Sequence, residues 1–217
     1  MTEPRATTKV ESRWGIALAT FLVLLLTLLP GRVRASPTWL VVVLAIGLIV
    51  PLLALPVVAA KERWLRIERV TVLVFLVLVA AAQIVDLLHL LFIMLGPPKG
   101  ISGLQLLNSS IALWATNVLM YSIIYWWIDR GGPQRRISST DADEDWHFPR
   151  VDVEGASAEW RPTYVDYLFL AFCTATAFSP TEALPMTPRA KLLMMSESII
   201  SLITIVAIAS RAIAMLG

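Results

Sequence analysis

Successive long runs of apolar residues constrain this chain more than any other feature of its sequence. They cover residues 14–29, 39–60, 70–95, 104–128 and 188–216. A bilayer core about 30 Å thick requires roughly 20 apolar residues per helix. Charged residues make up 16% of the chain, whereas soluble domains carry about 25%. We therefore predict an all-α, multi-pass integral membrane protein of the cell membrane with about five transmembrane helices.

The first two runs have features of their own. The first is short and ends at Pro30 without a small-residue cleavage pattern, so we interpret it as a retained helix, with a cleaved signal peptide as the alternative. The second contains Pro51 and Pro56, which membrane helices tolerate because neighbouring groups can satisfy the freed carbonyls. With the third run they form a predicted N-terminal membrane region over residues 1–100.

Several function classes find no support in the sequence. Cys173 is the only cysteine, which excludes internal disulfides and thiolate zinc clusters. The two histidines, His89 and His147, belong to no HExxH motif, and GxSxG and GxxxxGK[ST] motifs are absent. The net charge of +2 is scattered, unlike a nucleic-acid surface. We predict a protein that is not an enzyme, with no cofactor, metal site or nucleic-acid partner.

One long polar segment, residues 129–162, follows the fourth run. Its five arginines and eight acidic residues give it a net charge of −3. The segment is either a solvated linker or a small lid over the membrane domain. The fourth run closes with Tyr125, Trp126 and Trp127, which we expect to form an aromatic belt at the membrane boundary.

A sixth apolar segment, residues 163–176, is too short to span a bilayer comfortably. Thr163 and Asp166 have the spacing of an N-terminal cap. Residues 177–187 contain two prolines and no helical pattern. We therefore predict a re-entrant half-helix followed by an irregular turn, which at membrane depth is tolerated only when buried in protein or lining a wet cavity. The negative end of the half-helix dipole would favour a cation there.

The stretch 174–191 reads TATAFSPTEALPMTPRAK. It resembles the pore loop of tetrameric potassium channels, including bacterial members with a degenerate filter. The positions that match the usual pattern are Thr174, Thr176, Glu182, Pro185, Thr187 and Lys191. The resemblance covers about half the chain and implies an outer helix, pore half-helix and inner helix over 101–217. It also implies a homo-tetramer around one axis that conducts monovalent cations through the lipid bilayer.

The centre of this pore loop departs from the family pattern. Ser179 and Thr181 replace the two glycines, and Pro180 replaces the tyrosine between them. Proline fixes φ, so the usual row of carbonyl rings is not expected. A polar collar of Thr176, Ser179 and Thr181 with a Glu182 ring would remain. The predicted ion pathway comprises Thr174, Thr176, Ala177, Phe178, Ser179, Pro180, Thr181 and Glu182.

Polar residues also lie inside other spans. Glu197, Ser201, Thr204 and Ile208 form one stripe of the last helix, which we expect to line a cavity. Alternatively, Glu197 lies near an interface or pairs with Lys191 or Arg211 of another subunit.

A second polar pair lies in the third span. Asp86 and His89 share a helix face, which would suit a proton or ion relay. The alternative for this pair is snorkelling or a structural hydrogen bond.

These features together predict a channel-like protein whose cation-conducting pore has an atypical, weakly selective filter. The alternative is a non-conducting membrane scaffold, or a small proton- or ion-coupled transporter that uses Asp86 and His89. Two arguments about the orientation in the membrane disagree. A potassium-channel topology places segment 129–162 outside the cell. However, the side that carries this segment would hold twelve basic residues against three on the other side, and the positive-inside rule places the side with more basic residues in the cytoplasm.

Overall fold

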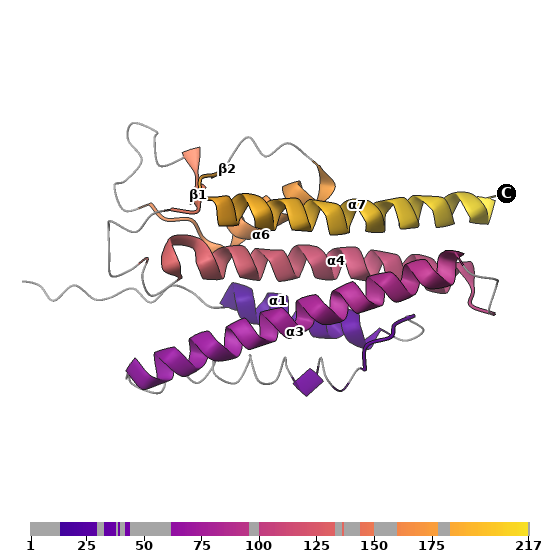
Figure 1. Cartoon of the computed structure of the whole chain (residues 1–217), viewed down its shortest axis with the longest axis horizontal. Helices are drawn as coiled ribbons and strands as arrows, with labels where there is room; N and C mark the ends of the chain where they lie inside the picture. Colours follow the sequence, from indigo (N-terminus) through magenta and orange to yellow (C-terminus); the bar gives the residue numbers. More distant parts are fainter. Residues whose placement is uncertain are drawn as a thin grey trace, which may run out of the picture.

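The computed structural model of the chain is mostly helical, and it describes residues 14–29, 33–37, 39, 42–43, 62–95, 100–132, 136, 144–149, 160–177 and 183–216. In chain order the elements are α1 (Trp14–Leu28), α3 (Glu62–Leu95), α4 (Gly103–Ile128), the short 3-10 helix η1 (Asp129–Gly131), β1 (Trp146–His147), α6 (Tyr164–Thr176), β2 (Leu184–Pro185) and α7 (Pro188–Leu216) (Figure 1).

Within the described residues, three helices are long and apolar enough to cross a membrane, over Val70–Leu95, Gly103–Gly131 and Pro188–Ser210. They correspond to three of the five predicted spans, so the prediction of a helical architecture of membrane type is confirmed to that extent. α1 has only 15 residues, fewer than the roughly 20 that a bilayer core requires. The predicted span at 39–60 lies almost entirely outside the described residues.

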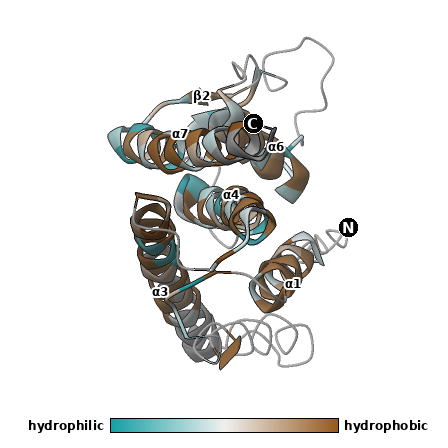
Figure 2. Cartoon of the chain, turned by 90° about the vertical axis from the view of Figure 1, so that its right-hand side faces the viewer, coloured by the Kyte–Doolittle hydropathy of each residue, from teal (hydrophilic) through white to brown (hydrophobic). Residues whose placement is uncertain are grey.

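α4 lies in the middle of the bundle, where it contacts α1, α3, α6 and α7 (Figure 2). It begins at a reciprocal cap. The backbone N–H of Gln105 donates to Ser102 Oγ at 3.2 Å, and Gln105 Oε1 accepts the backbone N–H of Ser102 at 2.9 Å. Because other helices surround α4, its polar side chains must find partners inside the protein.

The largest buried side chains gather where α4 ends. Tyr125, Trp126, Trp146 and Tyr167 are all fully buried. The ring of Trp146, from β1, lies 4.7 Å from the ring of Tyr125. The expected aromatic belt at the membrane boundary is therefore wrong. These side chains point into the protein because β1 and α6 cover this end of α4.

At one end of the bundle lie the end of α4, the β1–β2 pair and the start of α7 (Figure 1). We call this end, which carries residues 144–149, the lid end. α3 also begins at this end and runs antiparallel to α4. At the opposite end, the N–H of Val33 donates to Ser109 Oγ of α4 at 2.8 Å, and the N–H groups of Ala35 and Ser36 donate to the Asp86 carboxylate of α3. The basic stretch 62–69, which forms the first turns of α3 and is not a loop, therefore lies at the same end as the described residues 144–149.

Candidate functional site

α6 begins at the lid end of the bundle with the predicted cap. The Asp166 carboxylate accepts the backbone N–H of Thr163 at 2.6 Å and its hydroxyl at 2.7 Å. Tyr164 in the first turn packs against Gly15 of α1, where an added Cβ would lie 2.5 Å from the tyrosine ring. Its hydroxyl is 2.6 Å from Ser122 Oγ of α4.

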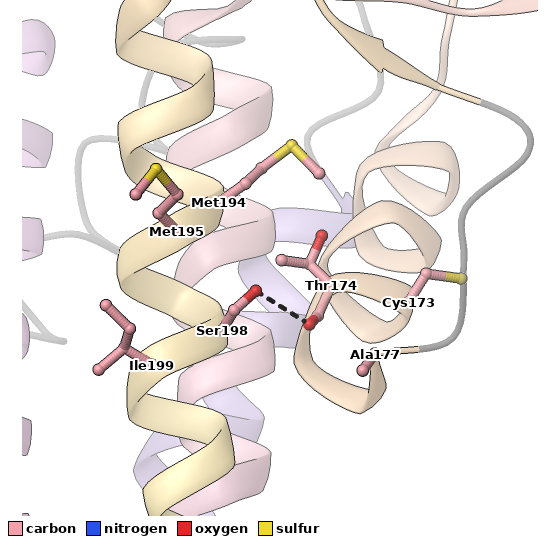
Figure 3. A pocket seen from close by; sticks show the side chains of 7 residues that line it. All are labelled: Cys173, Thr174, Ala177, Met194, Met195, Ser198 and Ile199. Carbon is pink, nitrogen blue, oxygen red and sulfur yellow. Dashed lines mark hydrogen bonds between the residues drawn. The ribbon is translucent and has the colours of Figure 1, made fainter.

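α6 ends beside the middle of α7. The Ser198 hydroxyl donates to the carbonyl of Thr174 at 3.3 Å (Figure 3). Ala177 closes the helix in the left-handed conformation, with φ of 54°, a position that usually holds glycine. After Ala177 the structure next describes Ala183, and β2, which follows directly, lies at the lid end of the bundle (Figure 1). α6 of 13 residues extends about 20 Å along its axis.

A pocket of about 430 Å³ lies between the end of α6 and α7. Its lining side chains are Cys173, Thr174, Ala177, Met194, Met195, Ser198 and Ile199 (Figure 3). The lining is mainly apolar, and Ser198 points across it toward the α6 carbonyl. The pocket therefore exposes the carbonyl end of α6 beside apolar side chains of α7.

Part of the polar segment 129–162 forms the lid, which we define as residues 144–149. Its strand β1 pairs antiparallel with β2, with Trp146 opposite Pro185 and His147 opposite Leu184. The backbone N–H of Met186 donates to the carbonyl of Asp145 at 2.8 Å. Of the two readings of this segment, the lid is correct for these residues, because they pair with the chain just before α7.

The Asp145 side chain fixes the lid to α7. It is fully buried and accepts the Thr187 hydroxyl at 2.6 Å. Arg189 donates to both of its oxygens, from Nε at 2.5 Å and from Nη2 at 2.6 Å. Such a bidentate pair is both strong and directional. The start of α7 is therefore held against β1.

Asp129, which directly follows α4, also binds the lid. One carboxylate oxygen accepts the N–H groups of Asp145 and Trp146 at 2.9 and 3.4 Å. The other accepts the Tyr167 hydroxyl at 2.5 Å. Arg136 lies over the rings of Trp126 and Tyr167, at 5.1 and 5.5 Å from their centroids. A single carboxylate thus joins α4, the lid and α6.

A chain of buried polar groups crosses the bundle from α3 to α7. Gln83 Nε2 donates to Asn117 Oδ1 at 3.0 Å, and Asn117 Nδ2 donates to Ser201 Oγ at 2.8 Å. Asn117 also reaches the backbone carbonyl of Glu197 at 3.3 Å. The hydroxyl of Tyr125 donates to Glu197 Oε2. We call these five residues the polar ladder.

The predicted cavity-lining stripe of α7 lies inside the chain instead. Glu197 and Ser201 are 0% exposed and Thr204 is 1% exposed. They face α4, where the polar ladder gives Glu197 and Ser201 partners, and Thr204 donates to the carbonyl of Ile200 at 2.7 Å. Ile208 is partly exposed. The expectation is corrected because a buried polar group needs a partner, and α4 supplies one for Glu197 and Ser201.

The predicted ion pathway is described only in part. Thr174, Thr176 and Ala177 lie in and just after the last turn of α6. The hydroxyl of Thr176 donates to the carbonyl of Phe172 at 2.8 Å, so it points back along the helix. The other predicted filter residues, 178–182, lie outside the described residues.

The predicted relay of Asp86 and His89 shares one face of α3, but the two residues have different surroundings. The buried Asp86 carboxylate accepts the N–H groups of Ala35 and Ser36 at 3.0 and 2.8 Å and the Ser36 hydroxyl at 2.8 Å. His89 is partly exposed. These three bonds favour the structural alternative for Asp86, because they tie residues 35–36 to α3.

The residues that organise this site were largely missed in the sequence. Asp145 stood in an acidic run, 141–145, whose members look alike, and Asp129 looked like an ordinary polar residue after a helix. The usable signal was the apolar Trp146 and Phe148 inside an otherwise polar segment, which marks a portion with something to bury. Within the described residues, no cluster of three or more potential metal ligands occurs.

Comparison with known proteins adds no relative. No protein-family model matches the chain, and no curated protein or solved structure matches it.

Proposed function

We propose that the chain is a channel-like membrane protein whose pore passes monovalent cations with weak selectivity. The path of α6 carries this proposal. It starts at the lid end, stops beside Ser198 in the middle of α7 and is followed by β2 at the lid end. A helix of about 20 Å that stops part-way along a longer helix fits a pore half-helix in a core of about 30 Å.

The exposed face of α7 supports assembly of several copies. Its large apolar side chains recur every three or four residues for four turns and are more than half exposed in the single chain. They are Leu192, Met195, Ile199, Leu202 and Val206. This spacing is that of a helix seam. The potassium-channel resemblance makes four copies around one axis the assembly that we propose.

The end of α6 supports a cation as the permeant species. Its last carbonyls carry the negative end of the helix dipole. The carbonyl of Thr174 borders the pocket beside Ser198. Ala177 holds a left-handed conformation without being glycine, and backbone of this kind is frequent at functional sites. The Glu182 ring predicted from the sequence would add further negative charge to the proposed pathway.

Electrical recording from the full chain in planar bilayers tests the proposal. We expect a cation-selective current that distinguishes poorly between K⁺ and Na⁺. Glu182→Gln should lower the cation-over-anion permeability ratio, because it removes the predicted ring of charge. The matched control is Glu144→Gln in the lid, where the carboxylate pairs with Arg130 at 2.7 Å. Absence of current under any ion or voltage, with a monomeric or dimeric mass, would refute the pore in favour of a non-conducting scaffold.

The orientation of the lid is a separate question with its own test. Residues 62–69 lie at the same end of the bundle as the lid, so Arg63, Arg66 and Arg69 count together with Arg130 and Arg136 toward the cytoplasmic side. Single cysteines at 140 and at 65, in a Cys173→Ser background, should label from the same side. A label from the cytoplasm at both sites would reverse the usual potassium-channel orientation while leaving the conduction test unaffected.

A further inference from the structure

Glu197 is a fully buried acidic residue within helix α7. It stands nine residues after Pro188 in α7, about 14 Å along the helix axis, and is 0% exposed. Tyr125 donates to Oε2. Among the described residues, Oε1 has no hydrogen-bond partner. A buried ionisable group in a membrane helix is a functional candidate by default.

No charged side chain faces this carboxyl from the described elements around it. From α4 the neighbours are Tyr125 and Tyr121, and the Tyr121 hydroxyl is 2.7 Å from Ser196 Oγ. From the lid it is Trp146, whose ring lies against the ring of Tyr125 at a tilt of 49°. α6 contributes Cys173 and Thr174, which line the adjoining pocket with Ser198. The polar ladder adds only neutral amide and hydroxyl groups.

The described charges on α7 itself are distant or already paired. Arg189 binds Asp145 at the lid, two helical turns before Glu197. Lys191 is six residues away and exposed, so water solvates it. Glu197 therefore has a single neutral donor where an ionised carboxylate would need several donors or a cation.

Burying the neutral acid form of Glu197 costs much less free energy here than burying its carboxylate. Leaving a neutral O–H or carbonyl oxygen without a partner costs about 1–3 kcal/mol. Leaving a carboxylate charge buried and unpaired costs several kcal/mol after relaxation. We propose that Glu197 is a proton-binding site of the membrane domain. Its carboxylate takes up one proton to become the neutral acid, which Tyr125 holds by donating to the carbonyl oxygen.

This site also has a physical connection to the end of α6. The hydroxyl of Tyr125 contacts both Glu197 and the Thr174 side chain. Ser198, the residue after Glu197, donates to the Thr174 carbonyl. Gain or loss of the proton thus alters a contact shared by α4, α6 and α7. The proposal needs no conduction, so it stands or falls independently of the pore.

Infrared spectroscopy of the full chain in lipid nanodiscs tests this site. At neutral pH we expect a C=O band of a protonated carboxylic acid that disappears in Glu197→Gln. The glutamine side chain matches the neutral acid in shape, so this variant should fold. The matched control Glu144→Gln should keep the band, because the Glu144 carboxylate is ion-paired and partly exposed. Tyr125→Phe should keep the band but move it to higher frequency, because a hydrogen bond to the carbonyl is lost.

Three results would overturn the proposal. The first is an acid band of equal intensity in the wild type and Glu197→Gln. The second is loss of a carboxylate band, rather than an acid band, in that variant at neutral pH. The third is a carboxylate band that responds to K⁺ or Na⁺ at constant pH, which would make Glu197 a metal-cation site instead. If Glu197→Gln fails to fold, an unshifted band in Tyr125→Phe would still refute the assignment.

Discussion

The pair formed by Asp145 and Arg189 should contribute far more to stability than a typical surface ion pair. The Asp145 side chain is 0% exposed, whereas Arg189 is 57% exposed. Removing Arg189 leaves a buried carboxylate with only the Thr187 hydroxyl as a side-chain donor. Removing Asp145 leaves an arginine that water can solvate. Arg189→Ala should therefore be at least as destabilising as Asp145→Ala, although it removes the more exposed side chain.

The size of the expected destabilisation follows from the burial of the Asp145 carboxylate. Removing one partner of a fully buried pair costs about 3–5 kcal/mol. Water reaches Arg189, so we place Arg189→Ala at the lower end, near 3 kcal/mol. Asp145→Ala should cost about 2 kcal/mol from lost charged hydrogen bonds. The control pair is Arg130 and Glu144, each 27% exposed and 2.7 Å apart. Its coupling energy should be no more than about 1 kcal/mol.

A double-mutant cycle for each pair measures these values, with unfolding of the full chain in mixed micelles followed by tryptophan fluorescence. Trp146 is fully buried beside Asp145 and should report loss of the lid. Hydrogen exchange at the Met186 amide supplies a local reading, because this N–H donates to the Asp145 carbonyl. Equal coupling energies for the two pairs, or an unchanged Met186 exchange rate in Arg189→Ala, would refute the reasoning.

Three further predictions concern α1, α3 and α6. Ala177→Gly should stabilise the protein by about 1 kcal/mol in the same unfolding assay, because φ is 54° there; destabilisation would contradict this conformation. Gly15→Ala should cost about 1–3 kcal/mol because its Cβ would meet the Tyr164 ring, and Tyr164→Ala should relieve most of that cost. Asp86→Ala should speed hydrogen exchange at the Ser36 amide at least tenfold, whereas an unchanged rate would remove its proposed structural role.

The long helices could be predicted from the sequence because their length and hydropathy alone identify them. The spans at 70–95, 104–128 and 188–216 follow from apolar runs that a bilayer core requires. The start of α6 followed from local chemistry, because the Asp166 carboxylate reaches back to Thr163. Features of this kind depend on neighbours in the chain, which periodicity and cap residues report directly.

The partners of the polar residues could not be predicted, because they come from distant elements. The stripe through Glu197 and Ser201 was visible in the sequence, but a polar stripe fits a water-lined cavity and a neighbouring helix equally well. Asn117 lies 80 residues before Glu197, and no local pattern links them. Asp145 was hidden for the same reason, since its partner Arg189 follows a separate helix and turn.

The placement of polar groups on α7 constrains how the proposed pore would work. Glu197 and Ser201 face α4 inside each copy, so they do not line an opening between copies. The exposed face carries apolar side chains such as Ile199 and Leu202 instead. Because this face forms the proposed seam between copies, it does not line the opening either. In such a pore, the polar contacts that stabilise a cation would come from the carbonyl end of α6 and the turn that follows it.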